Sequence, residues 1–357
     1  MKNLRKMAAV LFAMTYLSAM YVNAQDVETV AGLGNVGIQD GVEASFHVPA
    51  DVLVLPGGGI LVADKFNNLL RLVDTDGETS TFAGIIPEFF PIGFHRDGVL
   101  GELGLFHPSS LALSEHGWIY IADASNNSIR VIVGDRIFTH VGWGEAGFAD
   151  GPRGVAAFNH PSAITMAADG VIYVADTLNH VIRRVGTDGY TTTLAGIPGE
   201  YGYENGPADA ALFDSPSGIA VSSDGRIFVA DTGNHVIKVI ENGVVSTLAG
   251  SSNLLEDYDF PVGGFADGAG DVAMFNQPRG LAMWGDYLIV ADSANHSIRL
   301  VAQDGYVTTI FGAEFAGYEL ETLHFPMGIS VYGNRLYIAD SGNNKIRMIL
   351  LWDYTSE

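Results

Sequence analysis

The sequence of 357 residues contains no cysteine. Disulfides therefore cannot stabilise the fold, and a lipoprotein anchor attached through cysteine is excluded as well. An exported chain without disulfides has to be held together by packing and by closure of its architecture. Apolar residues are abundant enough for this role, because they make up 48% of the chain.

Positive charge is also scarce. The chain has 18 Lys and Arg against 41 Asp and Glu, which gives a formal net charge of −23 at pH 7. Nucleic acids and anionic lipid surfaces bind to positively charged faces of proteins. We therefore expect no nucleic-acid partner, and the charge balance is compatible with cations as ligands.

A marked hydrophobic run lies near the N-terminus. Three basic residues among the first six precede the apolar stretch Met7–Met20, and Val22-Asn23-Ala24 offers the small residues that a signal peptidase reads. We predict a signal peptide over residues 1–24 and one domain over 25–357. No later run is long enough to span a bilayer, and the final segment LLWDYTSE is no hydrophobic anchor. The expected location is therefore secreted, periplasmic or extracellular, without membrane insertion.

What the chain does contain is a repeat. An apolar run ending in Ala-Asp occurs six times at intervals of 48–61 residues, as in IYVADTLNH and IFVADTGNH, and an Asn always follows three residues after the Asp. We interpret this Asp-x-x-Asn link as turn chemistry, in which the Asp accepts N–H bonds inside the turn and the Asn tolerates a left-handed backbone. The next position alternates between His and Asn, which is typical of a turn hydrogen bond. The aspartates are Asp64, Asp123, Asp176, Asp231, Asp292 and Asp340.

Each repeat reads as four strands separated by turns such as Asp-Gly and Asn-Gly. Six such units without helical segments predict an all-β protein, a six-bladed β-propeller of four-stranded blades. The last repeat ends after KIRMIL without a fourth strand, whereas VETVAG at Val27–Gly32 matches the fourth-strand segment VSTLAG at Val245–Gly250. We therefore predict that the N-terminal strand completes the last blade and closes the ring.

The segment FDSPSGIAVSSDGRIFVADTGNHVIK, Phe213–Lys238, resembles the NHL repeat, and the resemblance covers nearly all of the chain after residue 24. It implies a β-propeller. It says less about activity, since NHL propellers serve as binding platforms, sensors and, in some branches, lyases. The amidating-lyase branch uses a metal in the central channel, but its three inward His and its base cannot be matched residue by residue, so no catalytic residue is assigned.

The segments before the first strand of each repeat are expected to reach one mouth of the central channel. Two residues before a recurring Pro, His47 and His324 lie in repeats that become neighbours when the ring closes, and Asp214 takes the same position in the fourth repeat. His160 and His107 directly precede their Pro. A set of two His and a carboxylate can hold a divalent metal such as zinc or calcium. The alternative is a polar rim without a metal.

Two other features recur or stand out. The third strand of each repeat carries one Lys or Arg. We interpret its aliphatic part as lying between two blades and its charged group as paired with a carboxylate. Two long links, Gly84–Gly98 and Ser251–Gly268, lie on the same face as the His residues and carry aromatic side chains that form a binding surface or fold back over the channel. These aromatic residues are Phe89, Phe90, Phe94, Tyr258 and Phe260.

We expect a monomeric module that binds a protein, a peptide or a carbohydrate through the long-loop face and the channel mouth. The alternative is a metal-dependent lyase or hydrolase whose site lies at the channel mouth. The sequence shows no Ser-His-Asp nucleophile signature, P-loop or dinucleotide motif in its proper context. Whether the protein is an enzyme is therefore left open at this stage.

Overall fold

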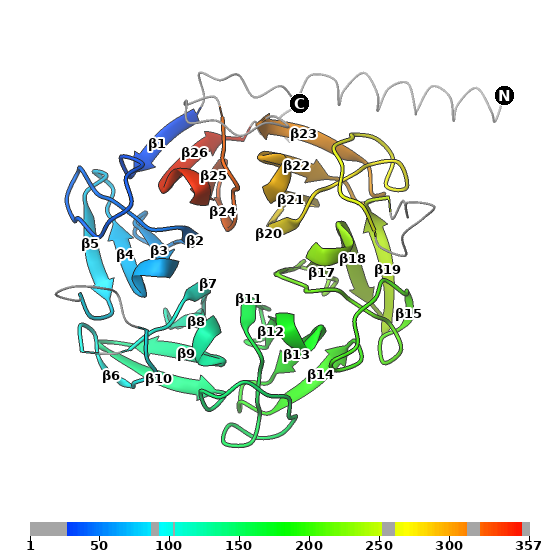
Figure 1. Ribbon diagram of the computed structural model, residues 1–357, viewed down its shortest axis with the longest axis horizontal. Helices are drawn as coiled ribbons and strands as arrows, with labels where there is room; N and C mark the ends of the chain where they lie inside the picture. The colour runs from blue at the N-terminus through cyan, green and yellow to red at the C-terminus, as the bar shows by residue number, and fades with distance from the viewer. Residues whose placement is uncertain (1–26, 87–92, 103, 252–260, 313–321, 352–357) are drawn as a thin grey trace.

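The computed structural model describes residues 27–86, 93–102, 104–251, 261–312 and 322–351, so the predicted signal peptide lies outside the described residues. Six antiparallel sheets form a closed ring around a central axis (Figure 1). Within each sheet the strands follow one another from the axis to the rim. This arrangement confirms the predicted six-bladed propeller of four-stranded blades.

The first three blades are built from consecutive strands of the chain. Blade one contains β2 (Pro49–Val54), β3 (Ile60–Asp64), β4 (Leu69–Val73) and β5 (Thr79–Ala83). Blade two contains β7 (Pro108–Leu113), β8 (Ile119–Asp123), β9 (Ser128–Val133) and β10 (Arg136–Val141), with the short β6 (Gly98–Val99) at its outer edge. Blade three contains β11 (Pro161–Met166), β12 (Ile172–Asp176), β13 (Val181–Val185) and β14 (Thr191–Ala195).

Blades four and five repeat this plan, and blade six takes one strand from the other end of the chain. Blade four contains β16 (Gly218–Val221), β17 (Ile227–Asp231), β18 (Val236–Glu241) and β19 (Val244–Ala249), with the short β15 (Gly206–Pro207) at its edge. Blade five contains β20 (Pro278–Trp284), β21 (Tyr287–Asp292), β22 (Ser297–Val301) and β23 (Val307–Gly312). Blade six contains β24 (Ile329–Tyr332), β25 (Arg335–Asp340), β26 (Lys345–Leu350) and β1 (Val27–Ala31).

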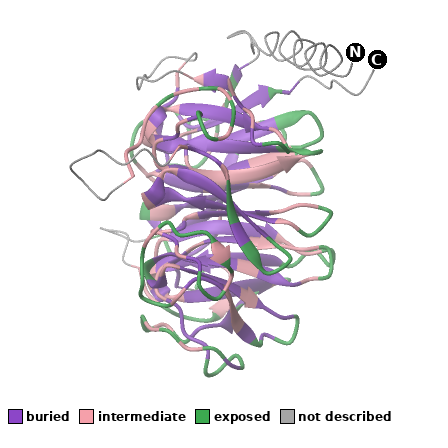
Figure 2. Cartoon of the chain, turned by 90° about the vertical axis from the view of Figure 1, so that its right-hand side faces the viewer, coloured by how far each residue is buried: buried purple, intermediate pink, exposed green. Residues whose placement is uncertain are grey.

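The hydrophobic core lies between the blades. Second strands such as β8 are buried along their whole length, because a neighbouring blade covers each face. One core cluster joins Leu61 and Ala63 of blade one to Ile121 and Ile132 of blade two, and the other clusters join the remaining neighbours in the same way. Seen edge-on, buried residues fill the strands and exposed residues gather in the loops (Figure 2). A single blade cannot bury its apolar faces alone, so the ring has to close.

Strand β1 closes the ring. It pairs antiparallel with β26, so that Val27 lies opposite Ile349 and Thr29 opposite Arg347. The Arg347 guanidinium donates a hydrogen bond to Thr29 Oγ1 at 2.9 Å. At Gly32 the backbone has φ +93°, and a Cβ there would lie 2.6 Å from the carbonyl oxygen of Asn344, so a glycine is needed at this crossing. The predicted closure by the N-terminal strand is confirmed.

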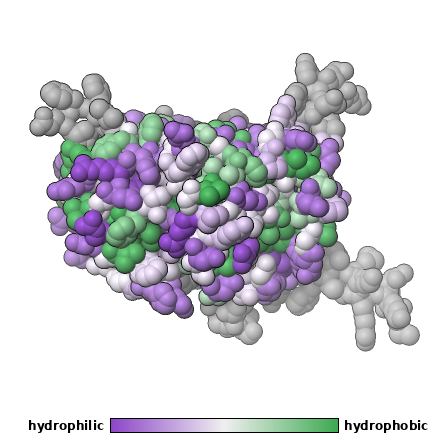
Figure 3. All heavy atoms as spheres, turned by 90° about the horizontal axis from the view of Figure 1, so that it is seen from below, coloured by the Kyte–Doolittle hydropathy of each residue, from purple (hydrophilic) through white to green (hydrophobic). Residues whose placement is uncertain are grey.

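The outer surface is mixed in character. On the rim that faces the viewer in Figure 3, hydrophobic side chains form separate small groups among hydrophilic ones. Within the part of the chain that the structure describes, no helix is long and apolar enough to cross a membrane.

Deleting Val27–Gly32 should lower the stability of the propeller strongly. The deletion leaves β26 unpaired on its outer edge and removes Val27 from the core between blades five and six. Losing one buried valine and the hydrogen bonds of a short strand costs about 3 kcal/mol or more. Thermal unfolding measures the loss, and a synthetic peptide spanning residues 25–34 should restore the melting temperature when added to the deleted chain. A deleted chain that melts like the intact protein would contradict closure by β1.

Candidate functional site

One face of the disc, which we call the link face, carries the six short 3-10 links between second and third strands. The segment before each first strand reaches the same face, because the first two strands are antiparallel and Pro49, for example, lies opposite Asp64. The link face therefore surrounds one mouth of the central channel. The links are η2 (Lys65–Asn67), η3 (Ala124–Asn126), η4 (Thr177–Asn179), η5 (Thr232–Asn234), η6 (Ser293–Asn295) and η7 (Ser341–Asn343).

A buried carboxylate organises each link. In blade one, Asp64 Oδ1 accepts the backbone N–H of His47 at 2.8 Å. Its Oδ2 accepts hydrogen bonds from Asn67 Nδ2 at 2.7 Å and from Arg71 Nη1 at 3.0 Å. Burial raises the pKa of Asp64, and these bonds oppose the rise. The motif carboxylates of the other five blades likewise accept the N–H of the residue two before the recurring Pro.

This network corrects the predicted role of the motif Asp. We expected the carboxylate to accept backbone N–H groups inside its own turn, but Asp64 makes no such capping bond and accepts only the side-chain amide of Asn67 there. Instead it holds the segment that enters the first strand, 17 residues earlier in the chain. The motif Asp is structural, as expected, but it acts between segments that are distant in the sequence.

The cations of the third strands complete the network. Arg71 Nη2 also contacts Asp40 Oδ1 at 2.6 Å, and Asp40 belongs to an Asp-Gly pair that recurs upstream of several blades. In blade four Lys238 replaces the arginine and Asn205 replaces this aspartate. The interpretation that these cations pair with carboxylates is confirmed. They are fully buried, and they are Arg71, Arg130, Arg183, Lys238, Arg299 and Arg347.

The alternating His or Asn after each link joins one blade to the next. In each case the side chain accepts the backbone N–H of the residue that precedes the Pro of the following blade, at 2.8–3.1 Å. Asn offers Oδ1 and His offers Nδ1, which explains why the two residue types interchange. The acceptor and donor pairs are Asn68–His107, Asn127–His160, His180–Ser215, His235–Gln277, His296–Phe325 and Asn344–Val48.

Both partners of these junctions have left-handed backbones. The residues before Pro have φ of 50–56°, and the acceptor residues have φ of 49–58°. The left-handed residue of each link is therefore the His or Asn that follows the motif Asn, one position later than we expected. Left-handed backbones at β-branched Val48 and at bulky Phe325 are unusual, and the junction bonds to their N–H groups hold them.

The candidate metal ligands are spread around the mouth. His47 packs its ring against Phe66 with centroids 5.1 Å apart, and His324 lies beside His296 at 5.5 Å. Asp214 Oδ1 lies 3.6 Å from His180 Nδ1. All of these side chains are half-buried, except that Phe66 is exposed.

His107 and His160 take other partners. His107 Nδ1 lies 2.8 Å from Ser125 Oγ. Burial lowers the pKa of His160, and the nearby charges of Lys65 and Arg279 lower it further. Across the described ranges, no group of three or more His, Cys, Asp or Glu side chains is placed to hold a metal ion. A metal bound by His47, His324, Asp214 and His160 stays a prediction.

The predicted aromatic binding surface has one member within the described residues, Phe94. Phe89, Phe90, Tyr258 and Phe260 lie outside the described residues. Phe94 is half-buried, its carbonyl oxygen accepts a hydrogen bond from Asn126 Nδ2, and its ring fills the space that a side chain at Gly104 would occupy. Phe94 therefore helps to fix its own loop to blade two, and the wider aromatic surface stays a prediction.

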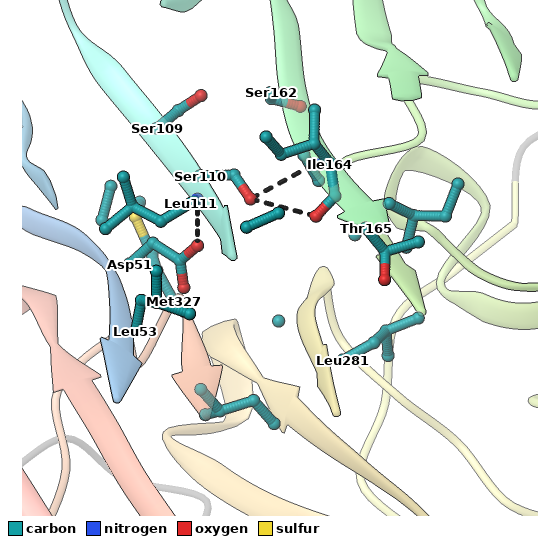
Figure 4. A pocket seen from close by; sticks show the side chains of 18 of the residues that line it. Asp51, Leu53, Ser109, Ser110, Leu111, Ser162, Ile164, Thr165, Leu281 and Met327 are labelled. Carbon is teal, nitrogen blue, oxygen red and sulfur yellow. Dashed lines mark hydrogen bonds between the residues drawn. The ribbon is translucent and has the colours of Figure 1, made fainter. Parts of the chain in front are cut away.

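A cavity of about 310 Å³ occupies the central channel and is lined by the first strands of all six blades (Figure 4). Its wall includes Asp51, which is accessible only in part. Asp51 Oδ2 accepts the N–H of Leu111 in the next blade at 2.8 Å, and Oδ1 accepts the N–H of Val52 at 2.9 Å. Burial raises the pKa of Asp51 to about 7, although these bonds lower it.

Two cations also line this cavity, and the sequence analysis missed both. Lys65 is the first residue of η2, where the other blades have Ala, Thr or Ser. Arg279 follows the Pro of blade five, where four other blades have Ala or Ser and blade six has Met. Aligning the six repeats position by position would have found them, because each is a large charged residue at a position otherwise occupied by uncharged ones.

A second cavity, of about 370 Å³, lies away from the link face, between blades two and three. It is lined by Trp118, Tyr120 and His140 among others, and burial lowers the pKa of His140 to about 4. His140 packs edge-on against Tyr120 with ring centroids 5.1 Å apart. This cavity draws on two blades, whereas the channel cavity draws on all six, so we take the channel as the candidate site.

Comparison with known proteins agrees with this architecture. Residues 213–240 match the family model of the NHL repeat. The chain is an NHL-repeat β-propeller. Human NHL repeat-containing protein 2 is 32% identical over 164 residues, which cover 41% of this propeller and 23% of that protein. Protein SUPPRESSOR OF QUENCHING 1, chloroplastic, from Arabidopsis thaliana is 30% identical over 244 residues, which cover 62% of this chain and 22% of that protein.

This NHL-repeat propeller thus spans less than a quarter of the length of those two relatives. Among solved structures, an auxiliary nutrient binding protein from Bacteroides thetaiotaomicron superimposes with a TM-score of 0.65 at 16% identity, covering 90% of this chain and 75% of that chain. Similarity at this level of identity shows the fold alone.

The junction histidines give the propeller a defined response to acid. His180, His235 and His296 each accept an N–H through Nδ1, so each must be neutral, and burial lowers the pKa of all three. As the pH falls, these histidines therefore take up protons in the unfolded chain at a higher pH than in the folded protein. This favours the unfolded chain, so the stability that the three groups contribute is lost as the pH falls below about 6.5. Replacing all three by Asn, the residue of the other junctions, should reduce the drop in melting temperature between pH 7 and pH 5.

The matched control replaces the same three residues by Ala, which removes the acceptors. At pH 7 that variant should lose about 1 kcal/mol per junction, whereas the Asn variant should stay close to the original protein. An Asn variant whose melting temperature falls as steeply with acid as that of the original protein would show that the junctions do not titrate.

Proposed function

We propose that the protein is an exported binding module that holds a small ligand in the channel mouth on the link face. The proposal rests on the cavity of about 310 Å³ that the first strands of all six blades line. This volume lies at the lower end of the range for small-molecule sites, about 300–1,000 Å³. Three ionisable side chains line the cavity, Asp51, Lys65 and Arg279.

None of these three residues is required by the repeat. At the positions of Asp51 and Lys65 the other blades carry small residues such as Gly, Ala, Ser or Thr, and at the position of Arg279 they carry uncharged ones. A departure from a repeat that the fold does not need is the mark of a functional position. The rim around the cavity is preorganised as well, because a motif carboxylate and a junction side chain hold each segment before the first strand.

The ligand is proposed to be a small nutrient. The auxiliary nutrient binding protein that shares the fold is consistent with a nutrient such as a carbohydrate or peptide. Export rests on the predicted signal peptide at residues 1–24. The aromatic residues of the two long links would extend the site outward toward a protein partner. A metal-dependent lyase or hydrolase at the same mouth stays a prediction.

Blocking the channel should abolish binding without unfolding the protein. Thr165, on the first strand of blade three, lines the cavity and is half-buried, so Thr165→Trp fills part of the space. Thr192→Trp, on the outer strand of the same blade, is the matched control. Thermal unfolding is measured with glucose, maltose, diglycine, glucuronate, acetate and inorganic phosphate as probes.

At least one probe should stabilise both the original protein and Thr192→Trp, by about 2.7 kcal/mol at a hundredfold excess over Kd, and should leave Thr165→Trp unchanged. If no probe stabilises the original protein, or if Thr165→Trp responds as the control does, the channel is not the ligand site.

A further inference from the structure

The two channel cations differ from the other buried cations of the propeller. Each third-strand cation is fully buried and lies within 3.1 Å of a motif carboxylate, as in the Lys238–Asp231 and Arg183–Asp176 pairs. Lys65 and Arg279 form no ion pair with any carboxylate of the described residues. Acidic residues outnumber basic ones by more than two to one, so two cations without an ion pair in one cavity need a reason.

Lys65 and Arg279 also act on each other. The Arg279 charge and, more strongly, burial lower the pKa of Lys65 to about 8. Lys65 likewise lowers the pKa of His107 and His160 at the same mouth, after burial, and no carboxylate opposes these shifts. Burial and the nearby cations thus favour the neutral forms of both histidines, and the positive charge at this mouth comes from Lys65 and Arg279, which line the same cavity. Two like charges without a carboxylate partner among the described residues raise the energy of the empty protein and favour a bound negative charge.

The donor atoms are available for a ligand. No hydrogen bond to a described residue uses the Lys65 ammonium, and it remains accessible in part. Arg279 stacks its guanidinium over the ring of Phe325 at 5.4 Å, and its Nε is buried without a hydrogen-bond partner among the described residues. Stacking on one face leaves the edge of the guanidinium free to donate, and a guanidinium edge matches two oxygens of a carboxylate or phosphate.

Asp51 does not neutralise these cations. Both of its oxygens are engaged by backbone N–H groups of Val52 and Leu111 on the cavity wall. Burial raises its pKa to about 7, so the neutral form of this carboxyl is favoured more than in water, and it forms no ion pair with Lys65 or Arg279. Asp51 lines the same cavity and is suited to contact the uncharged part of a ligand.

We infer that the channel mouth is an oxyanion site, in which Lys65 and Arg279 hold the carboxylate or phosphate group of a small organic ligand. This inference rests on the proposed function and specifies the class of its ligand. The net charge alone suggested cations as ligands, because a protein of charge −23 repels anions in general. An anion can still bind where the two unpaired cations lie in one cavity.

The test uses the residues that the repeat itself supplies. Lys65→Thr restores the residue of blades three and four, where Thr177 and Thr232 donate to the Pro carbonyl of the next blade at 2.8 Å and 2.6 Å. Arg279→Ser restores the residue of blades two, three and four. Both variants should therefore fold, and the matched control for the loss of one positive charge is Arg136→Ser on the exposed outer strand of blade two.

Calorimetric titration and thermal unfolding are measured at low ionic strength in a chloride buffer, with inorganic phosphate, acetate, glucuronate and glucose as probes. Phosphate or a carboxylate should bind both the original protein and Arg136→Ser. Whichever of the two binds more tightly identifies the anionic group of the ligand. Each channel variant should weaken that binding about ten- to a hundredfold, and the double variant should abolish it. In the same buffer without phosphate or a carboxylate, the double variant should melt at a higher temperature than the original protein, because the repulsion between Lys65 and Arg279 is gone.

Three results would overturn the inference. The first is that neither phosphate nor a carboxylate binds the original protein, and the second is that the double variant binds them as tightly. The third is that, without these ligands, the double variant melts at a lower temperature than the original protein. Glucose binding that Thr165→Trp removes but the double variant keeps would overturn the anion class alone and leave the channel as a ligand site. Absence of binding by every probe would remove both proposals together.

Discussion

The buried motif carboxylate is the interaction on which the rest of the propeller depends. Asp64 and its five counterparts each bind the N–H of an incoming segment, the amide of a link and the cation of a third strand. Removing one such carboxylate would leave a fully buried cation without its buried partner, which is far more costly than the loss of a surface ion pair. Through this one side chain, each blade positions its first strand and therefore its share of the channel wall.

The junctions extend this local order around the ring. Each His or Asn acceptor connects one blade to the next, and Asn344 returns the series to Val48 in blade one. The covalent chain closes the same circle through β1 and β26. The rim of the channel is thus fixed by repeated structural residues, which frees the remaining positions on the channel wall to differ from blade to blade.

The sequence predicted the fold well because the fold is periodic. Six copies of one strand pattern, a missing fourth strand and its match at Val27–Gly32 are sufficient to define the ring. The partners of Asp64 were harder to predict, since His47 lies 17 residues away in the chain and no local pattern reports such a bond. The cations of the channel wall, Lys65 and Arg279, were not predicted for a different reason. A periodic pattern reports what the blades share, whereas these two residues differ from the repeat.

Amide hydrogen exchange tests most directly the claim that the motif carboxylates and the junctions lock the mouth of the channel. The N–H groups of His47 and Val48, bound by Asp64 and Asn344, stand for the twelve such groups in the ring. The account predicts that they exchange as slowly as the N–H groups of the inner strands, although they lie outside regular strands. Exchange at the rate of the exposed hairpin turns would contradict it, because the rim would then not be held by these side chains.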